Sequence, residues 1–188
     1  LVIGEAVNGK ISYSAVNSCI LFLPSLDGKQ ILTVETLADG GLHLIQQTMI
    51  DLHGSQCGFC TPGIMMSLLS MHLNGAAKSR IAIDDALVGN LCRCTGYGPI
   101  IDAAEITCKT PIDAEWKGWI SLAEKQLIDW SNDSGVLKIE TNLCSYIAPN
   151  TQDQLMESLI DYPDAMLVSG ATDVGLWVTK MGKRLSVV

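Results

Sequence analysis

Four cysteines in two tight pairs dominate the chemistry that this sequence could perform. The first pair, Cys57 and Cys60, has C-x2-C spacing, and the second pair, Cys92 and Cys94, has C-x-C spacing. Each pair is followed at once by Thr and by residues that start helices, so the two segments look like one motif used twice. Four thiolates can hold either a structural zinc ion or a [2Fe–2S] cluster.

The surroundings of the two pairs favour the cluster over zinc. Zinc sites of this kind usually carry two C-x2-C pairs on turns, whereas both pairs here adjoin helix starts. A [2Fe–2S] cluster with four thiolates is negatively charged, and a helix N-terminus carries partial positive charge. Gly58, Gly63 and Gly96 would let backbone N–H groups approach the sulfurs. Core or disulfide-bonded cysteines are a third interpretation, although a disulfide between Cys92 and Cys94 would be strained.

Four helices are predicted to position these cysteines. The first begins near Leu42, and the others span about residues 62–73, 84–88 and 99–108, with a polar loop from Ala76 to Arg80. The second helix is apolar almost all round, which is typical of a helix at the centre of a bundle. Because the cysteine pairs precede the second and fourth helices, the sequence predicts a compact unit with approximate twofold symmetry.

The segments on either side of this unit are predicted to contain strands and further helices. Asn8-Gly9 between two alternating runs predicts a β-hairpin from Leu1 to about Val16, because a type I′ turn needs positive φ at both positions. Thr151 and Gln154 have the spacing of a capping box at a helix start. Ala165–Val168 is expected to form a short strand before a small-residue turn and a helix. On spacing alone, an ordinary turn is favoured there over an anion-binding one.

Composition and charge exclude several classes of partner. The chain of 188 residues has a formal net charge of −8, which disfavours nucleic acid and anionic membranes. We find no apolar run of the roughly 18 residues that a membrane span requires. Seven cysteines, an odd number, favour a reducing, cytoplasmic setting over a secreted disulfide framework. His43, His53 and His72 lack ligand spacing.

The two cysteine segments, Gly54–Gly63 and Gly89–Tyr97, resemble the helical [2Fe–2S] domain of the molybdenum hydroxylase (xanthine oxidase) family. The resemblance covers almost the whole chain and is closest to the small subunit of the bacterial xanthine dehydrogenases. It implies a segment of a longer, multidomain α+β polypeptide. The implied parts are a truncated plant-type ferredoxin (β-grasp) tail, a four-helix [2Fe–2S] bundle, a linker that is extended and partly helical, and the start of an α+β FAD-binding domain. Their boundaries would be 1–38, 39–108, 109–145 and 146–188.

The resemblance also implies roles for individual residues. Cys57, Cys60, Cys92 and Cys94 would hold one [2Fe–2S] cluster, and Cys19 would be one ligand of a second. Gln56 and Cys94 would contact the molybdopterin cofactor of a partner subunit. An FAD-contacting segment is implied at Leu167, Val168, Ser169, Gly170, Ala171, Thr172, Asp173 and Val174.

The implied function is electron transfer during purine hydroxylation. Electrons would pass from a molybdenum centre on a large partner subunit, through the two [2Fe–2S] clusters, to FAD and then NAD. No catalytic residue is expected in this chain, because the substrate pocket would lie on the partner. Two other functions stay open: the same relay in an aldehyde or N-heterocycle oxidoreductase, and a zinc-stabilised interaction module without a redox role.

Overall fold

The computed structural model describes residues 1–38, 40–75, 79–133 and 135–188. It separates into two compact units. Unit 1 comprises Leu1–Val16 and Lys29–Ile128, and unit 2 comprises Asn17–Gly28 and Asp129–Val188. Residues 76–78 of the expected polar loop, and residue 39 at one proposed domain boundary, lie outside the described residues.

Unit 1 begins with the expected hairpin. Strands β1 (Val2–Val7) and β2 (Lys10–Ala15) pair antiparallel from Val2 opposite Ala15 to Val7 opposite Lys10. Asn8 and Gly9 between them have φ of 52° and 75°, so the type I′ prediction is confirmed. Strand β3 (Gln30–Leu32) pairs antiparallel with the other edge of β1, which gives the order β2-β1-β3. The short 3-10 helix η2 (Val34–Ala38) follows β3.

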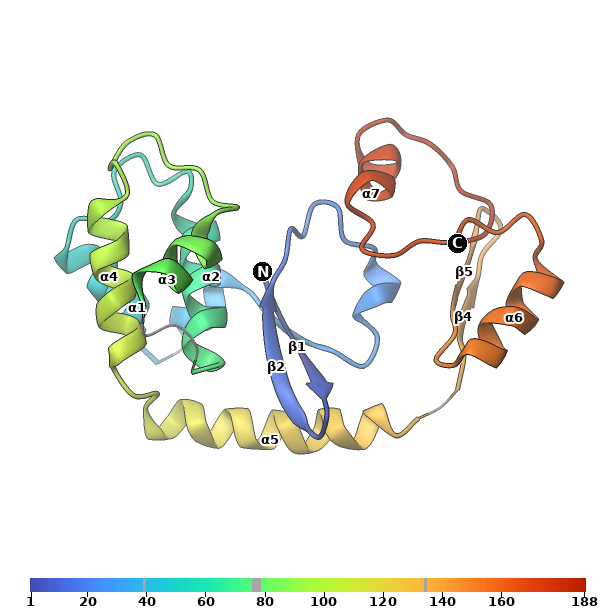
Figure 1. Cartoon of the computed structure of the whole chain (residues 1–188), viewed down its shortest axis with the longest axis horizontal. Helices are drawn as coiled ribbons and strands as arrows, with labels where there is room; N and C mark the ends of the chain where they lie inside the picture. Colours follow the sequence, from blue (N-terminus) through green and yellow to red (C-terminus); the bar gives the residue numbers. More distant parts are fainter. Residues whose placement is uncertain (39, 76–78, 134) are drawn as a thin grey trace. The chain divides into compact units, whose positions relative to one another are not determined.

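The first four helices after η2 in unit 1 are those that the sequence predicts (Figure 1). They are α1 (Leu44–Asp51), α2 (Thr61–Leu73), α3 (Arg80–Leu87) and α4 (Gly98–Lys109). Helix α3 begins at Arg80 rather than at Asp84, because the Ser79 side chain accepts a hydrogen bond from the Ala82 N–H at 3.3 Å and caps an earlier turn.

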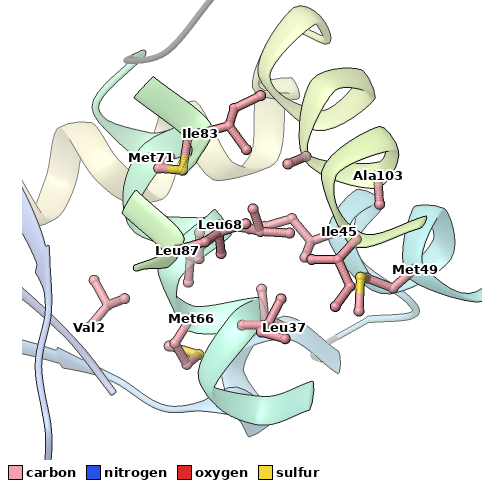
Figure 2. Close-up of a cluster of buried hydrophobic side chains, with 14 of the residues drawn as sticks. Val2, Leu37, Ile45, Met49, Met66, Leu68, Met71, Ile83, Leu87 and Ala103 are labelled. Atoms are coloured by element: carbon pink, nitrogen blue, oxygen red, sulfur yellow. The ribbon is translucent and has the colours of Figure 1, made fainter. Parts of the chain in front are cut away.

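The core of unit 1 is continuous from the hairpin through the helices (Figure 2). Helix α2 contacts each of α1, α3, α4 and β2, which explains why its apolar residues cover most of its circumference. Figure 2 shows Val2 from β1 near Met66 and Leu87, and Ile45 and Met49 of α1 near Ala103 of α4. The helical group therefore has one shared core, and its position on the hairpin is fixed by side chains of α2.

Helix α5 (Ala114–Ser131) is longer than the sequence suggested. It is an 18-residue helix, in a range where the resemblance implied an extended, partly helical linker. The sequence shows no clean helical period there because only Leu127 of this helix is fully buried. Glu124 Oε1 accepts a hydrogen bond from the Ile11 N–H at 3.1 Å, so α5 covers the outer edge of β2 (Figure 1).

Unit 2 combines a small sheet with two helices and the short 3-10 helix η1 (Leu23–Leu26). Strands β4 (Leu137–Glu140) and β5 (Ser145–Ala148) pair antiparallel. Helix α6 (Gln152–Asp161) starts at the predicted capping box, which is confirmed with both of its bonds present. Helix α7 (Thr172–Thr179) completes the unit.

One expectation in unit 2 is wrong. Ala165–Val168 has no strand assignment, although the sequence predicted one. The Met166 N–H donates to the Val187 carbonyl at 3.0 Å, and the isolated bridge beside it joins Val187 to Ser145 instead. A short apolar run becomes a strand only when a partner supplies a ladder of bonds. No helix in the described ranges is both long and apolar enough to cross a membrane.

Candidate metal centre

Both cysteine pairs lie in loops that lead into helices of unit 1. Cys57 and Cys60 lie between α1 and α2, and Cys92 and Cys94 lie between α3 and α4. Figure 1 shows these two loops beside each other at one end of the helical group. Helices α2 and α4 therefore both begin at the cysteines. Their N-terminal partial positive charges lie where the sequence predicts a negatively charged cluster.

Backbone turns shape the first loop. Gly54 ends α1 with its N–H donated to the Met49 carbonyl at 2.8 Å. Gly58 has a φ of 81°, a conformation that glycine adopts without strain, and its carbonyl accepts from the Thr61 N–H at 3.3 Å. The hydroxyls of Ser55 and Thr61 hydrogen-bond each other at 2.6 Å and join the two sides of the loop.

Thr95 and Tyr97 organise the second loop. The Thr95 hydroxyl lies 3.2 Å from the sulfur of Cys92, and it accepts from the Tyr97 N–H at 3.2 Å. The Tyr97 hydroxyl in turn accepts from the Cys92 N–H at 2.8 Å. Gly96 and Tyr97 both have a φ of 68°, which turns the chain sharply into α4. These bonds hold both the backbone and the sulfur of Cys92.

Asn90 holds the second loop against the helix that follows the first. Its Nδ2 donates to the Ser67 hydroxyl on α2 at 2.7 Å. Its Oδ1 would lie 2.8 Å from a Cβ added at Gly63, so the absence of a side chain at Gly63 permits this close approach. The two cysteine loops are therefore joined by side-chain contacts of unit 1 as well as by the cysteines.

The thiols interact across the two loops in pairs. Cys57 and Cys94 perturb each other's pKa through their side chains, and so do Cys60 and Cys92. The Phe59 N–H and the Cys94 thiol lower the pKa of Cys57, while the same interaction with Cys57 raises the pKa of Cys94. The first cysteine of one motif thus lies against the last cysteine of the other.

Cys60 and Cys92, which interact across the two loops, differ in the acidity of their thiols. The Thr95 hydroxyl and N–H lower the pKa of Cys92 to about 7. Burial, followed by the interaction with Cys92, raises the pKa of Cys60 to about 11. A thiolate is the form that binds metal, so Cys92 is the member of this pair that is prepared for ligation at neutral pH.

The four thiols form a soft donor set. Soft sulfur ligands suit iron–sulfur clusters and zinc alike, so the ligand type does not distinguish the two. Coulombic interactions also link Cys92 with Cys57 and with Cys94, so the thiols influence one another across both loops. A [2Fe–2S] cluster takes four such thiolates, two on each iron.

The rim of this site is apolar and open to solvent. Phe59 is 95% exposed and Leu91 is 83% exposed, and each lies beside a cysteine. Gln56 is exposed next to Cys57. Two large apolar side chains with nearly full exposure therefore flank the cysteines.

The remaining predicted residues belong to unit 2. Cys19 is exposed in the Asn17–Gly28 segment, and this segment packs on α7, because a Cβ added at Gly175 would overlap the Ile20 carbonyl oxygen. Leu167–Val174 forms the turn before α7 and its first residues, with Gly170 and Ala171 at φ of 71° and 58°.

Sequence reasoning did not identify the supporting residues Thr95, Tyr97 and Asn90. The repeated Cys-Thr after each pair was visible, but it did not reveal that the second Thr bonds a sulfur. The sequence also carried no sign that Phe59 would be almost fully exposed. The histidines have structural places: His43 caps α1, and His72 is buried on α2.

Comparisons with known proteins agree with this site. A family model described as "[2Fe-2S] binding domain" matches residues 33–105, which include all four paired cysteines. The chain is 51% identical over 106 residues to a xanthine dehydrogenase of Blastobotrys adeninivorans, covering 55% of this chain and 8% of that protein. It is 32% identical over 209 residues to aldehyde oxidase 3 of Rattus norvegicus, covering 90% of this chain and 16% of that protein.

A crystal structure of quinoline 2-oxidoreductase from Pseudomonas putida 86 has 31% sequence identity and a TM-score of 0.44, covering 65% of this chain and 67% of that chain. The family model and the cysteine site define an iron–sulfur domain of an oxidoreductase. The chain belongs to the molybdenum hydroxylase family, which contains the xanthine dehydrogenases and aldehyde oxidases. It spans only a small part of the length of these curated relatives.

Proposed function

We propose that this chain is an electron-transfer segment of a xanthine dehydrogenase-type enzyme, in which Cys57, Cys60, Cys92 and Cys94 hold a [2Fe–2S] cluster. The observation that carries this proposal is the pairing of the four thiols across two helix N-termini, inside the region that matches the family model. When bound, such a cluster supplies a centre that accepts and donates one electron at a time.

The protein residues around the thiols would set the potential of this site. The N-termini of α2 and α4 place partial positive charge beside a negatively charged group. The Thr95 hydroxyl is positioned to hydrogen-bond the sulfur of Cys92, and such bonds stabilise the more negative, reduced form. Both effects favour acceptance of an electron by this segment.

Gln56 and Cys94 are proposed to face the molybdopterin of a molybdenum-binding large subunit. Three features support this direction: the exposure of Gln56, the exposure of Cys94, and the exposed apolar rim formed by Phe59 and Leu91. An exposed rim of this type excludes water from a protein contact when a partner covers it. The partner would therefore approach the cysteine end of unit 1.

The later steps of the relay are proposed for residues of unit 2. Cys19 would be a ligand of a second [2Fe–2S] cluster, and Leu167–Val174 would contact FAD, which passes electrons to NAD. The small residues of this turn and the free N–H groups at the start of α7 would suit a phosphate-bearing cofactor. The domain boundaries at residues 38, 108 and 145, and a cytoplasmic location, stay predictions.

A second candidate keeps the relay but changes the substrate to an aldehyde or an N-heterocycle. The match to rat aldehyde oxidase 3, which covers 90% of this chain, is the observation that favours it. None of the residues proposed as cluster or cofactor ligands would contact the substrate. Steady-state assays of the intact enzyme with xanthine and with aldehydes would separate the two candidates.

Rapid mixing of the intact enzyme with its reducing substrate, without oxygen, tests the proposed relay. Loss of visible absorbance from the oxidised cluster should follow substrate addition within the turnover time. Gln56→Ala should slow this step, whereas Gln152→Ala, an exposed residue at the start of α6, should leave it unchanged. A cluster that stays oxidised during turnover would contradict a role in electron transfer.

A further inference from the structure

Unit 1 contains a cavity of about 290 Å³ that is formed by the N-terminal regions of α1 and α5. Its walls include Leu37, Leu42 and His43 on one side and Asp113, Trp116 and Trp119 on the other. All of these residues belong to unit 1. The cavity adjoins the starts of α1 and α5, whereas the cysteines lie at the starts of α2 and α4, so the proposed cluster site does not use it.

The aromatic part of the wall is ordered by ring contacts. The rings of Trp116 and Trp119 meet edge to face with centroids 5.4 Å apart, and the ring of His43 meets Trp116 in the same way at 4.9 Å. Behind His43 lies His72, which is only 5% exposed and whose two ring nitrogens have no hydrogen-bond partner. His72 is not among the described residues that line the cavity, so its contact supports the His43 ring and not a ligand.

The charges on this wall are negative. Asp113 and Glu115 line the cavity, and no Lys or Arg is among the described residues that line it. Two helix N-termini would by themselves attract an anion, but a side chain already accepts from one N–H group of each. His43 Nδ1 accepts from the Ile45 N–H at 3.2 Å, and Asp113 Oδ1 accepts from the Trp116 N–H at 2.9 Å. The two carboxylates therefore decide that a ligand of this cavity carries positive charge.

From this arrangement we propose that the cavity binds an organic cation, namely a guanidinium or alkylammonium group. Indole rings attract such groups through their π-electrons, and carboxylates at the rim pair with their charge. The volume is at the lower end of ligand pockets, so it suits one cationic head group with a few carbon atoms. Either a free amine or an Arg or Lys side chain of another polypeptide offers this chemistry.

The test uses the full chain with ¹⁵N-labelled tryptophan and follows the indole N–H signals by NMR. Arginine amide should shift the signals of Trp116 and Trp119 in a saturable manner, while Trp130 and Trp177, which do not line the cavity, serve as internal references. Citrulline amide has nearly the same shape without the charge, and it should bind at least about fivefold more weakly. Equal binding of the two amides would overturn the proposal.

Matched variants separate charge from folding. Asp113→Asn keeps an oxygen that can cap α5 and removes only the charge, and Glu115→Gln removes the second charge of the lining. The double variant should bind arginine amide about tenfold more weakly, since it loses two exposed charge pairs. Unchanged binding by the double variant would also overturn the proposal.

A peptide arm identifies the source of the cation. The peptide is Gly-Gly-Arg-Gly-Gly with both ends blocked. Binding at least about tenfold tighter than arginine amide assigns the site to a side chain of a polypeptide, and similar binding assigns it to a free amine. The proposal does not depend on the cluster, so these results are independent of the proposed redox function.

Discussion

The Thr95 hydroxyl lies 3.2 Å from the sulfur of Cys92, and this contact makes the Cys92 thiol more acidic. It is the first cause of the lowered pKa of Cys92, which stands at about 7. The same hydroxyl accepts from the Tyr97 N–H and so belongs to the turn that starts α4. One side chain therefore shapes the loop and prepares the ligand.

Thr95→Val should lower the reduction potential of the proposed cluster. Removal of one hydrogen bond to a ligating sulfur destabilises the more negative, reduced state by about 1 kcal/mol, or about 40 mV for a one-electron couple. A redox titration followed by EPR measures the shift. Thr95→Ser keeps the hydroxyl and is the matched control. Equal potentials for the Val and Ser variants would show that this bond does not act on the cluster.

Cys57→Ser and Cys94→Ser should each remove the cluster and destabilise unit 1. Binding free energy of a metal centre is also folding free energy, so thermal unfolding should begin at least about 10 °C lower. Circular dichroism with iron analysis measures both effects. Cys144→Ser changes an exposed cysteine of unit 2 and should alter neither. Native stability in Cys57→Ser would mean that the cluster does not hold this fold together.

Gly175→Ala should destabilise α7 and loosen the segment that carries Cys19. The added methyl group would overlap the Ile20 carbonyl oxygen and would approach Ile20 Cβ to 3.0 Å. Overpacking of this kind costs about 2 kcal/mol, which corresponds to amide hydrogen exchange about 30-fold faster in α7. Gly118→Ala on α5 meets nothing within 4 Å, and it should leave exchange in α7 as it is. Unchanged exchange in Gly175→Ala would argue against this contact.

Unit 1 should lose stability as the pH falls below about 6.5. Burial, and next the neighbouring His72, lower the pKa of His43 to about 4, and burial also lowers the pKa of His72. Both imidazoles are thus neutral when folded, whereas the unfolded chain protonates them near pH 6.5. Between pH 6.5 and pH 4 the unfolded state binds more protons than the folded state. The free energy of unfolding therefore has its full value above pH 6.5 and declines as the pH falls toward 4.

Urea unfolding at pH 7.5 and pH 5 checks this dependence. His72→Leu removes one buried imidazole and should show a smaller loss of unfolding free energy between the two pH values than the parent chain. Lys10→Gln, a change on the exposed end of the hairpin, should retain the full loss. A pH dependence that is the same in His72→Leu as in the parent would exclude His72 as its cause.

Local sequence signals predicted much of the fold because their causes are local. Asn8-Gly9 requires positive φ at two adjacent positions, and the hairpin register follows from that turn. The capping box at Thr151 likewise depends on residues that are neighbours in the chain. Helices with strong apolar patterns, such as α2, were also found within about a residue of their ends.

Features that depend on distant partners were not predictable. The spacing of each cysteine pair suggested four ligands, but the contact between Cys57 and Cys94 follows only from the packing of α2 against α4. Helix α5 lacks a strong apolar period because a single residue, Leu127, is fully buried in it. Ala165–Val168 has the composition of a strand, but it is not paired along its length with a neighbouring strand. Its backbone bond to Val187 is made at Met166.

Iron analysis and EPR of the purified chain test the central claim most directly. The account predicts two iron atoms per helical domain, visible absorbance in the oxidised state, and a rhombic EPR signal from one unpaired electron after dithionite reduction. Substitution of any one of the four paired cysteines by Ser should abolish that signal. A colourless chain that carries one zinc ion and gives no EPR signal after reduction would contradict the account.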